Sequence, residues 1–161
     1  PVNVVYLGIG SNIGNRITHI EKAKSLLIEN NINLMAISSY YETPSWPNPK
    51  KPKFINIVLK VMCSQKPSEL LYLCKTIEVK LGRRKSAKNA PRECDIDIID
   101  FKGQVSNDGL NLPHKMMHKR NFVLIPLFEI DKDWVHPLFK TNIKDLILCL
   151  SNNEIRSIKQ I

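Results

Sequence analysis

The chain has 161 residues, 43% of them hydrophobic, with 24 Lys and Arg against 15 Asp and Glu. This length is typical of one domain that buries its core without disulfides or a structural metal, so we expect a single domain over residues 1–161. The four cysteines form no close pair and no apolar stretch approaches the roughly 18 residues of a membrane span, which argues against a zinc ribbon and a membrane protein. We expect a soluble, cytoplasmic protein with reduced, packed thiols, and its net charge of +9 favours an anionic partner.

The first part of the chain predicts two strands around one helix. Residues 2–9 are β-branched and aromatic and predict a buried strand that closes in the glycine-containing turn 8–12. Asn15 is a suitable N-cap for a helix that runs to about residue 30. Residues 33–42 then predict a second strand.

The middle of the chain predicts a strand and a helix between two loops. Four prolines within residues 44–53 exclude a helix or a central strand, so this segment must be a surface loop. Residues 54–63 predict a third strand, and Pro67 opens a helix to about residue 81. The basic segment 83–91 has no apolar period and predicts a second long loop.

The last part predicts a strand at 95–101, a hairpin arm at 102–105, a short buried helix at 122–129 and an amphipathic helix at 143–150. The resulting order of strand, helix, strand, strand, helix, strand matches the ferredoxin-like pattern. We therefore expect an α+β fold, a ferredoxin-like α/β sandwich whose mainly antiparallel sheet carries helices on its faces.

The positive charge is concentrated in one segment. Residues 44–92 hold twelve Lys and Arg and two acids, and Glu93, Asp95, Asp97 and Asp100 follow directly. A cationic stretch beside a carboxylate cluster suits a polyphosphate with its divalent metals. A solvated basic face and a nucleic-acid-binding module are the alternatives, and the second of these leaves the paired aspartates unexplained.

Asp95 and Asp97 are the sharpest local signal. Positions two apart on a strand point to the same side, about 6.6 Å from one another, so two carboxylates project from a rigid floor. Such a pair can hold two Mg²⁺ ions that also bind phosphate oxygens. Two idle aspartates on a solvent-facing edge are the alternative.

Three other motifs give weaker signals. The segment 8–14 lies between a strand and a helix but lacks the third glycine of a dinucleotide fingerprint, which argues against a nicotinamide-dependent oxidoreductase. His114 and His118 have the spacing of a zinc pair without an intervening Glu, so we interpret His114, Lys119 and Arg120 as hydrogen-bond donors to phosphate, with an ordinary surface as the alternative. Phe54 and Asn56 share a strand face, and a ring beside an amide suits a planar heterocycle.

Five motifs cover nearly the whole sequence in order: LGIGSNIGNR at 7–16, SSYYETPSW at 38–46, FIN at 54–56, PRECDIDIIDF at 91–101 and LPHKMMHKRNFVLIPLFEI at 112–130. Together they resemble the 6-hydroxymethyl-7,8-dihydropterin pyrophosphokinase family. Its members transfer the pyrophosphoryl group of ATP to a pterin alcohol and release AMP in folate biosynthesis. The family fold is the ferredoxin-like α+β sandwich expected above.

The resemblance implies a role for each motif residue. It implies that Asp95 and Asp97 bind two Mg²⁺ ions that bridge the phosphates of the co-substrate ATP. The pterin site it implies comprises Thr43, Pro44, Trp46, Phe54, Asn56 and Phe122. The ATP contacts it implies are Glu78, Arg83, Arg92, His114 and Arg120, with Arg83 and Arg92 joining the two aspartates as catalytic residues. It also implies a covalent or functional link to dihydropteroate synthase, and no nucleic-acid or membrane partner.

The sequence departs from the family pattern at three places. The loop 83–91 is one residue shorter than in the family, and Asn89 or a neighbour stands where members place a Trp that closes over the pterin. Lys115 replaces an aromatic residue that commonly follows the histidine. Trp46 stands where a Leu is frequent, and it is the alternative source of the missing ring.

Overall fold

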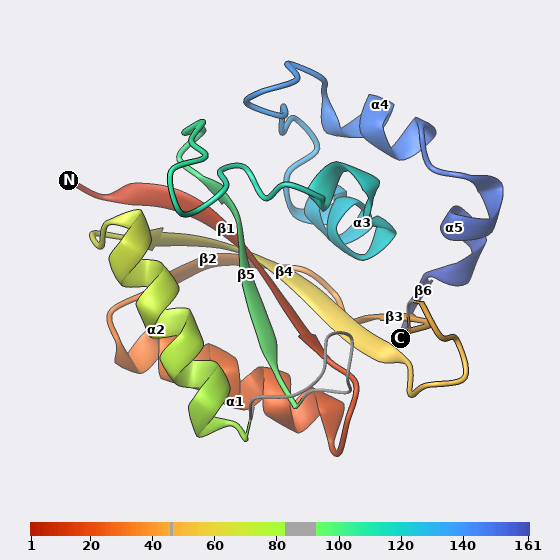
Figure 1. Cartoon of the computed structure of the whole chain (residues 1–161), viewed down its shortest axis with the longest axis horizontal. Coiled ribbons are helices and arrows are strands. Elements are labelled where there is room, and N and C mark those ends of the chain that lie inside the picture. The colour runs from red at the N-terminus through yellow and green to blue at the C-terminus, as the bar shows by residue number, and fades with distance from the viewer. Residues whose placement is uncertain (46, 83–92) are drawn as a thin grey trace.

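The computed structural model describes residues 1–45, 47–82 and 93–161, and it consists of one antiparallel sheet between helices (Figure 1). In chain order the elements are β1 (Asn3–Ser11), α1 (Arg16–Glu29), β2 (Asn33–Ile37), β3 (Tyr41–Thr43), β4 (Phe54–Cys63), α2 (Pro67–Lys80), β5 (Asp95–Phe101), η1 (Met117–Lys119), α3 (Asn121–Ile130), α4 (Ile143–Leu148), α5 (Asn152–Ser157) and β6 (Lys159–Gln160). The predicted α+β, ferredoxin-like fold is confirmed.

Strand β1 is an inner strand of the sheet, between β5 and β4. It pairs antiparallel with β4 on one side and with β5 on the other, so the strand order is β5-β1-β4-β3-β6. Strand β2 pairs with the second half of β4, and β3 pairs with its first three residues. The C-terminal strand β6 extends the sheet beyond β3. Three strands of the sheet thus meet side by side at β1.

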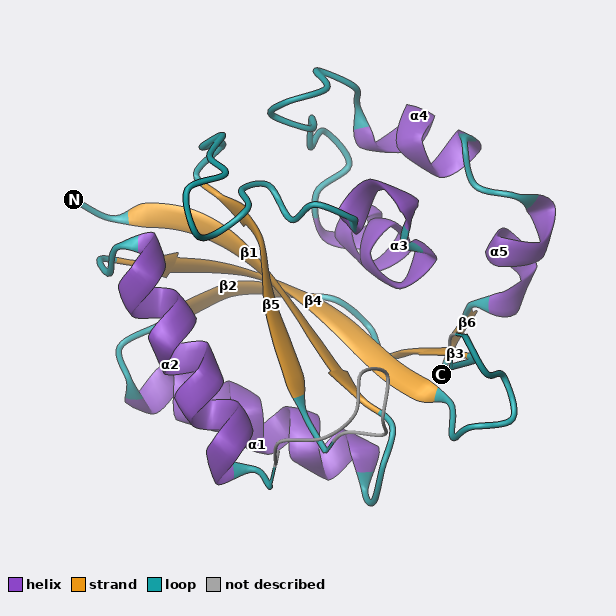
Figure 2. Cartoon of the chain, viewed as in Figure 1, coloured by secondary structure: helices purple, strands orange, loops and turns teal. Residues whose placement is uncertain are grey.

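Two hydrophobic cores cover the two faces of this sheet. On the first face, Val5, Leu7 and Ile9 of β1 alternate into a core closed by α1 and α2. On the second face, Tyr6 and Val58 belong to a core closed by α3 and α4. Figure 2 shows the two groups of helices on opposite sides of the strands. The period-two alternation of β1, β4 and β5 therefore contributes buried residues to both cores.

The structure corrects two of the predicted strands. β1 continues to Ser11, so Gly8 and Gly10 lie within the strand and the turn begins only after it. The single strand predicted over 33–42 is two strands, β2 and β3. They separate because the Ser38 hydroxyl accepts the Val58 amide at 2.9 Å and so replaces a backbone carbonyl in the ladder.

Two predictions for the C-terminal half are wrong. Residues 102–105 form a turn rather than a hairpin arm: Lys102 and Gly103 have positive φ, and the Gly103 amide donates to Asp100 Oδ1 at 2.9 Å. The helix predicted over 143–150 ends at Leu148, and α5 and β6 follow it unpredicted. The strands predicted at 54–63 and 95–101 are confirmed, and the loop predicted at 83–91 lies outside the described residues.

The sequence predicts packed thiols and no membrane-spanning segment. Cys63, Cys74 and Cys94 are buried, whereas Cys149 is exposed, so the expectation of packed thiols fails at that position. Burial raises the pKa of the Cys74 thiol to about 12. Within the described part of the chain, every helix is too short or too polar to span a membrane.

The first-face core predicts the response to truncation. Leu59 on β4 is fully buried, so Leu59→Ala should lower the free energy of unfolding by about 3 kcal/mol through lost burial and a cavity. Urea unfolding followed by circular dichroism measures this change. Leu148→Ala is the control, because Leu148 is 69% exposed and should shift stability by less than about 0.5 kcal/mol. Equal losses in the two variants would contradict the assignment of the core.

Candidate functional site

Two glycines of β1 create a trough on the second face of the sheet. The strand register places Gly10 between Asn56 of β4 and Asp95 of β5, and it places Gly8 opposite Asp97. Glycine has no side chain, so β1 places no side-chain atoms on this face between the carboxylates of β5 and the amide of β4, and the Asn56 and Ile99 side chains lie against the two glycines. The term trough refers to this strip of β1, which is the centre of the candidate site.

The space above Gly10 is occupied by the Asn56 side chain. A Cβ added at position 10 would collide with Asn56 Oδ1 and would touch the Phe54 ring at 3.5 Å. Asn56 is 7% exposed, and Thr43 of β3 pairs opposite Phe54. Pro44 follows and is exposed. The expectation that Phe54 and Asn56 share a face is confirmed, and the pairing of β3 with β4 brings Thr43 beside them.

The two aspartates of β5 open onto the other side of the trough. Asp95 and Asp97 are partly exposed, whereas Ile96 and Ile98 between and after them are buried against the first-face core. Burial and the neighbouring Asp95 carboxylate raise the pKa of Asp97 to about 6, and Arg120 and Lys75 oppose this rise. A bound cation would therefore stabilise the ionised form of the pair.

Arg120 and His114 stand beside the carboxylates. Arg120 Nη1 lies 3.6 Å from Asp97 Oδ2, and its guanidinium lies 5.4 Å from the centre of the Phe122 ring. His114 Nδ1 accepts the Met116 amide at 3.1 Å, which leaves the ring proton on Nε2. Burial, with Arg120 nearby, lowers the pKa of His114 to about 4. At neutral pH His114 is therefore an uncharged N–H donor.

Glu78 of α2 supports the site from the first face of the sheet. Its carboxylate is 1% exposed, and Oε2 accepts the Ile96 amide at 2.7 Å. Its other oxygen lies 3.5 Å from Lys75 Nζ. Ile96 lies between the two site aspartates on an edge strand, so Glu78 holds the outer edge of β5 in place. The interaction favours a positioning role for Glu78 over a direct contact with a ligand.

Asp100 does not join the predicted carboxylate cluster. It is 5% exposed and accepts hydrogen bonds from Trp134 Nε1 and the Gly103 amide, both at 2.9 Å. The register shift between Tyr6 and Leu7 pairs Asp100 with Tyr6 on the second face, further along β1 than Gly8 and Gly10, which pair with Asp97 and Asp95. Asp100 is therefore a structural carboxylate.

The donor set fits a hard divalent cation. No three His, Cys, Asp or Glu side chains within residues 1–45, 47–82 and 93–161 gather as metal ligands, which leaves the pair Asp95 and Asp97. Mg²⁺ commonly takes one or two carboxylates and completes its shell with phosphate oxygens and water. The predicted site residues Trp46, Arg83 and Arg92, together with Asn89, lie outside the described residues.

The glycine pair is the functional feature that sequence reasoning missed. The sequence predicts a turn at this segment, because its glycines precede a helix N-cap. The available signal was their spacing of two, since glycines at alternate positions of a strand clear one face of it for a ligand.

Sequence comparisons place these residues in a known family. The sequence model described as 7,8-dihydro-6-hydroxymethylpterin-pyrophosphokinase (HPPK) matches residues 6–132. The chain is 40% identical, over 88% of each chain, to the 2-amino-4-hydroxy-6-hydroxymethyldihydropteridine pyrophosphokinase of Aquifex aeolicus. It is 37% identical to the enzyme of the same name from Bacillus subtilis, covering 80% of this chain and 78% of that one. The folic acid synthesis protein FOL1 of Dictyostelium discoideum is 35% identical over 93% of this chain, which spans 23% of that longer protein.

Solved structures share the fold. The HPPK-DHPS protein of Plasmodium falciparum, crystallised with pteroate, superposes with a TM-score of 0.72 at 15% identity. The match covers 91% of this chain and 42% of that one. At this level of identity the similarity concerns the fold alone.

The carboxylate pair predicts a charge-dependent titration. Asp95→Asn should lower the pKa of Asp97 from about 6, because it removes the negative neighbour, whereas Arg120→Ala should raise it. Carboxyl ¹³C NMR titration measures both shifts. A pKa above the ordinary 3.8 means that the folded state binds the proton more tightly, so this group loses its stabilising contribution as pH rises from about 4 through 6. An Asp97 that titrates unchanged in both variants would contradict the coupling.

Proposed function

This chain belongs to the 7,8-dihydro-6-hydroxymethylpterin-pyrophosphokinase family, and we propose that the trough above Gly8 and Gly10 is where it carries out the family's reaction. The enzyme transfers the pyrophosphoryl group of ATP to the hydroxymethyl group of 6-hydroxymethyl-7,8-dihydropterin, giving the pterin diphosphate and AMP in folate biosynthesis. The observation that carries the proposal is the placement of a buried amide and a carboxylate pair on opposite sides of the two glycines of β1.

Asn56 and its neighbours form the proposed pterin side. The buried amide offers both a donor and an acceptor to the heterocycle, and Phe54 lies beside it. Phe122 at the start of α3, a helix that packs on β4, supplies a second ring. Thr43 and Pro44 complete this side of the site. The resemblance adds Trp46, which is the proposed stacking ring from the proline-rich loop.

Asp95 and Asp97 form the proposed phosphate side, where they would hold two Mg²⁺ ions. Bound there, the metals would neutralise the phosphates and draw them toward the carboxylates. Arg120 lies beside Asp97, and the His114 Nε2 proton is available to a phosphate oxygen. The resemblance adds Arg83 and Arg92 as further ATP contacts and catalytic residues. Glu78, also proposed for the ATP site, acts by holding β5.

The proposed step is an in-line displacement. The pterin hydroxymethyl oxygen forms a bond to the β-phosphorus of ATP, the bond from that phosphorus to the α,β-bridging oxygen breaks, and AMP leaves with this oxygen. The hydroxyl proton is released to solvent. Transfer of this kind depends mainly on alignment and charge neutralisation, so a strong general base is not obligatory. Three adjacent strands, β4, β1 and β5, that would hold both substrates at fixed separation are suited to this requirement.

We also propose the organisation and location of the enzyme. Both cores are built on the same three central strands, which supports a single pyrophosphokinase domain over residues 1–161. The free thiols and the need for ATP favour the cytoplasm. Relatives named as fused or bifunctional folate proteins support a functional link to dihydropteroate synthase, and no nucleic-acid or membrane partner is proposed.

The nucleotide product tests the function. The protein, incubated with 6-hydroxymethyl-7,8-dihydropterin, ATP and Mg²⁺, should release AMP, and chromatography distinguishes AMP from ADP. Asp97→Asn should reduce kcat by at least about 100-fold, because a carboxylate that would hold the metals is lost. Asp108→Asn in an exposed loop is the control and should retain full activity. ADP as product, or full activity in Asp97→Asn, would contradict the proposal.

Gly10→Ala tests the trough itself. The new methyl group collides with Asn56 Oδ1 and must displace the amide, so the Kd of the pterin should rise by about tenfold or more, which fluorescence titration measures. Gly8→Ala is the matched control on the same strand. Its Cβ would meet only the flexible end of Ile99, at 3.2 Å, so a smaller change of about twofold is expected. An unchanged Kd in Gly10→Ala would refute the assignment of Asn56.

A further inference from the structure

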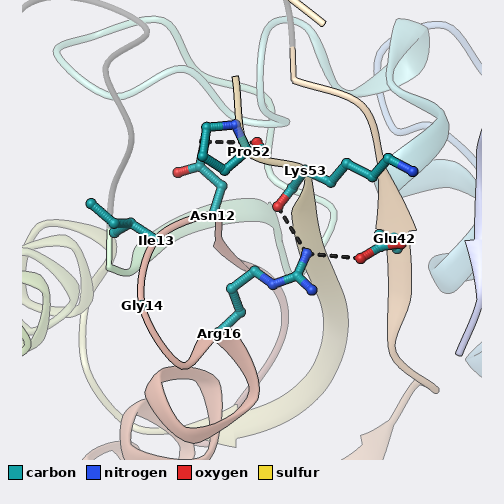
Figure 3. A pocket seen from close by; sticks show the side chains of 7 residues that line it. All are labelled: Asn12, Ile13, Gly14, Arg16, Glu42, Pro52 and Lys53. Atoms are coloured by element: carbon teal, nitrogen blue, oxygen red, sulfur yellow. Dashed lines mark hydrogen bonds and ion pairs between the residues drawn. The ribbon is translucent and has the colours of Figure 1, made fainter. Parts of the chain in front are cut away.

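A single guanidinium bridges the two ends of the proline-rich loop 44–53. Arg16 Nη1 donates to Glu42 Oε2 at 2.8 Å and to the Lys53 carbonyl at 3.0 Å. Glu42 lies just before the loop and Lys53 is its last residue. Figure 3 shows Arg16 reaching up from the start of α1 to both partners, at the wall of a pocket of about 390 Å³.

A second set of hydrogen bonds closes the same loop. Asn12 Nδ2 donates to Ser45 Oγ and to the Pro52 carbonyl, both at 3.3 Å, and the Ser45 hydroxyl donates to the Pro52 carbonyl as well. Within the loop, Asn48 Oδ1 accepts the Lys50 amide at 3.0 Å. The turn that follows β1 therefore holds both ends of the loop.

Arg16 is placed where its contacts can affect Thr43 and Phe54 on the proposed pterin side of the site. Its partner Glu42 precedes Thr43, and its partner Lys53 precedes Phe54. Thr43 and Phe54 pair with each other in the sheet, so both residues respond to movement of the loop ends. The side chains of Arg16 and Glu42 are 30% and 25% exposed, so solvent screens this ion pair less than an open surface pair.

We propose that Arg16 is a positioning residue for the pterin, acting through Glu42 and the Lys53 carbonyl to hold the ends of the loop 44–53 in the substrate-binding arrangement. This inference rests on the proposed function of the neighbouring Thr43 and Phe54. Arg16 itself touches neither the carboxylate pair nor the amide of Asn56 in the contacts of the described residues. Substitution of Arg16 should therefore weaken pterin binding and leave ATP binding unaffected.

Steady-state kinetics test the inference. Arg16→Ala and Glu42→Gln should each raise the KM for the pterin by about tenfold and leave the KM for ATP within about twofold. The double variant should be no worse than Arg16→Ala alone, because Glu42→Gln weakens a contact that Arg16→Ala has already removed. Arg16→Lys keeps the charge and should restore part of the loss. Lys24→Ala is the control, since it breaks the Lys24–Glu21 ion pair on the same helix and should change neither KM.

Limited proteolysis gives a readout that needs no activity. Trypsin cleavage after Lys50, identified by the mass of fragment 1–50, should be about fivefold faster in Arg16→Ala than in the wild type, because loosened loop ends open the chain to the protease. Lys24→Ala should match the wild type. If the wild type fails to produce AMP, the proposed function fails while this experiment still judges the role of Arg16.

Two results would overturn the inference. One is an unchanged pterin KM with an unchanged rate of cleavage after Lys50 in Arg16→Ala. The other is an equal rise of both KM values together with a lower melting temperature, which would show that Arg16 only stabilises the fold. Should Arg16→Ala fail to fold, Glu42→Gln and Arg16→Lys decide the question by the same measurements, because each changes few atoms.

Discussion

The register of β1 between β4 and β5 is the constraint on which the site depends. A slip of one residue would turn Gly8 and Gly10 to the opposite face and fill the trough with aliphatic side chains. Burial prevents such a slip, because Leu7 and Ile9 belong to the first-face core while Tyr6 belongs to the second. The geometry of the polar site is therefore set by hydrophobic contacts on both sides of the same strand.

The surroundings of Asp97 disfavour its ionised form when no ligand is bound. Asp97 is held where burial and Asp95 oppose its charge, and Arg120 at 3.6 Å compensates only in part, because the pKa of Asp97 is still raised. A carboxylate whose ionised form is disfavoured in this way is typical of functional sites, where a ligand supplies the compensating positive charge. The neutral state of His114 has the same origin, because burial beside a guanidinium excludes a second cation. These charges support the proposal that the site takes up phosphates together with a divalent metal.

Segments distant in sequence support the two sides of the trough. The family match ends at residue 132, yet Ile143 and Leu146 of α4 complete the core beneath the second face. The last strand, β6, pairs with β3 and borders the residues that lead into the proline-rich loop. Glu129 of α3 accepts hydrogen bonds from the Ser39 amide and hydroxyl, which joins this edge to the helix that carries Phe122. The C-terminal part of the chain therefore supports the side of the trough that is proposed to bind the pterin.

The sequence by itself determined the elements whose patterns are local. The apolar runs of β4 and β5, the Asn15 cap of α1 and the shared face of Asp95 and Asp97 follow from period-two alternation and capping chemistry, and the structure confirms each. Only the tertiary structure decided that Gly8 and Gly10 belong to a strand, because that depends on ladders with residues about 50 and 90 positions away. It likewise separated Asp100 from the pair and gave Glu78 its partner on β5. Local patterns specify which side chains share a face, whereas the contacts between distant strands specify what lies opposite them.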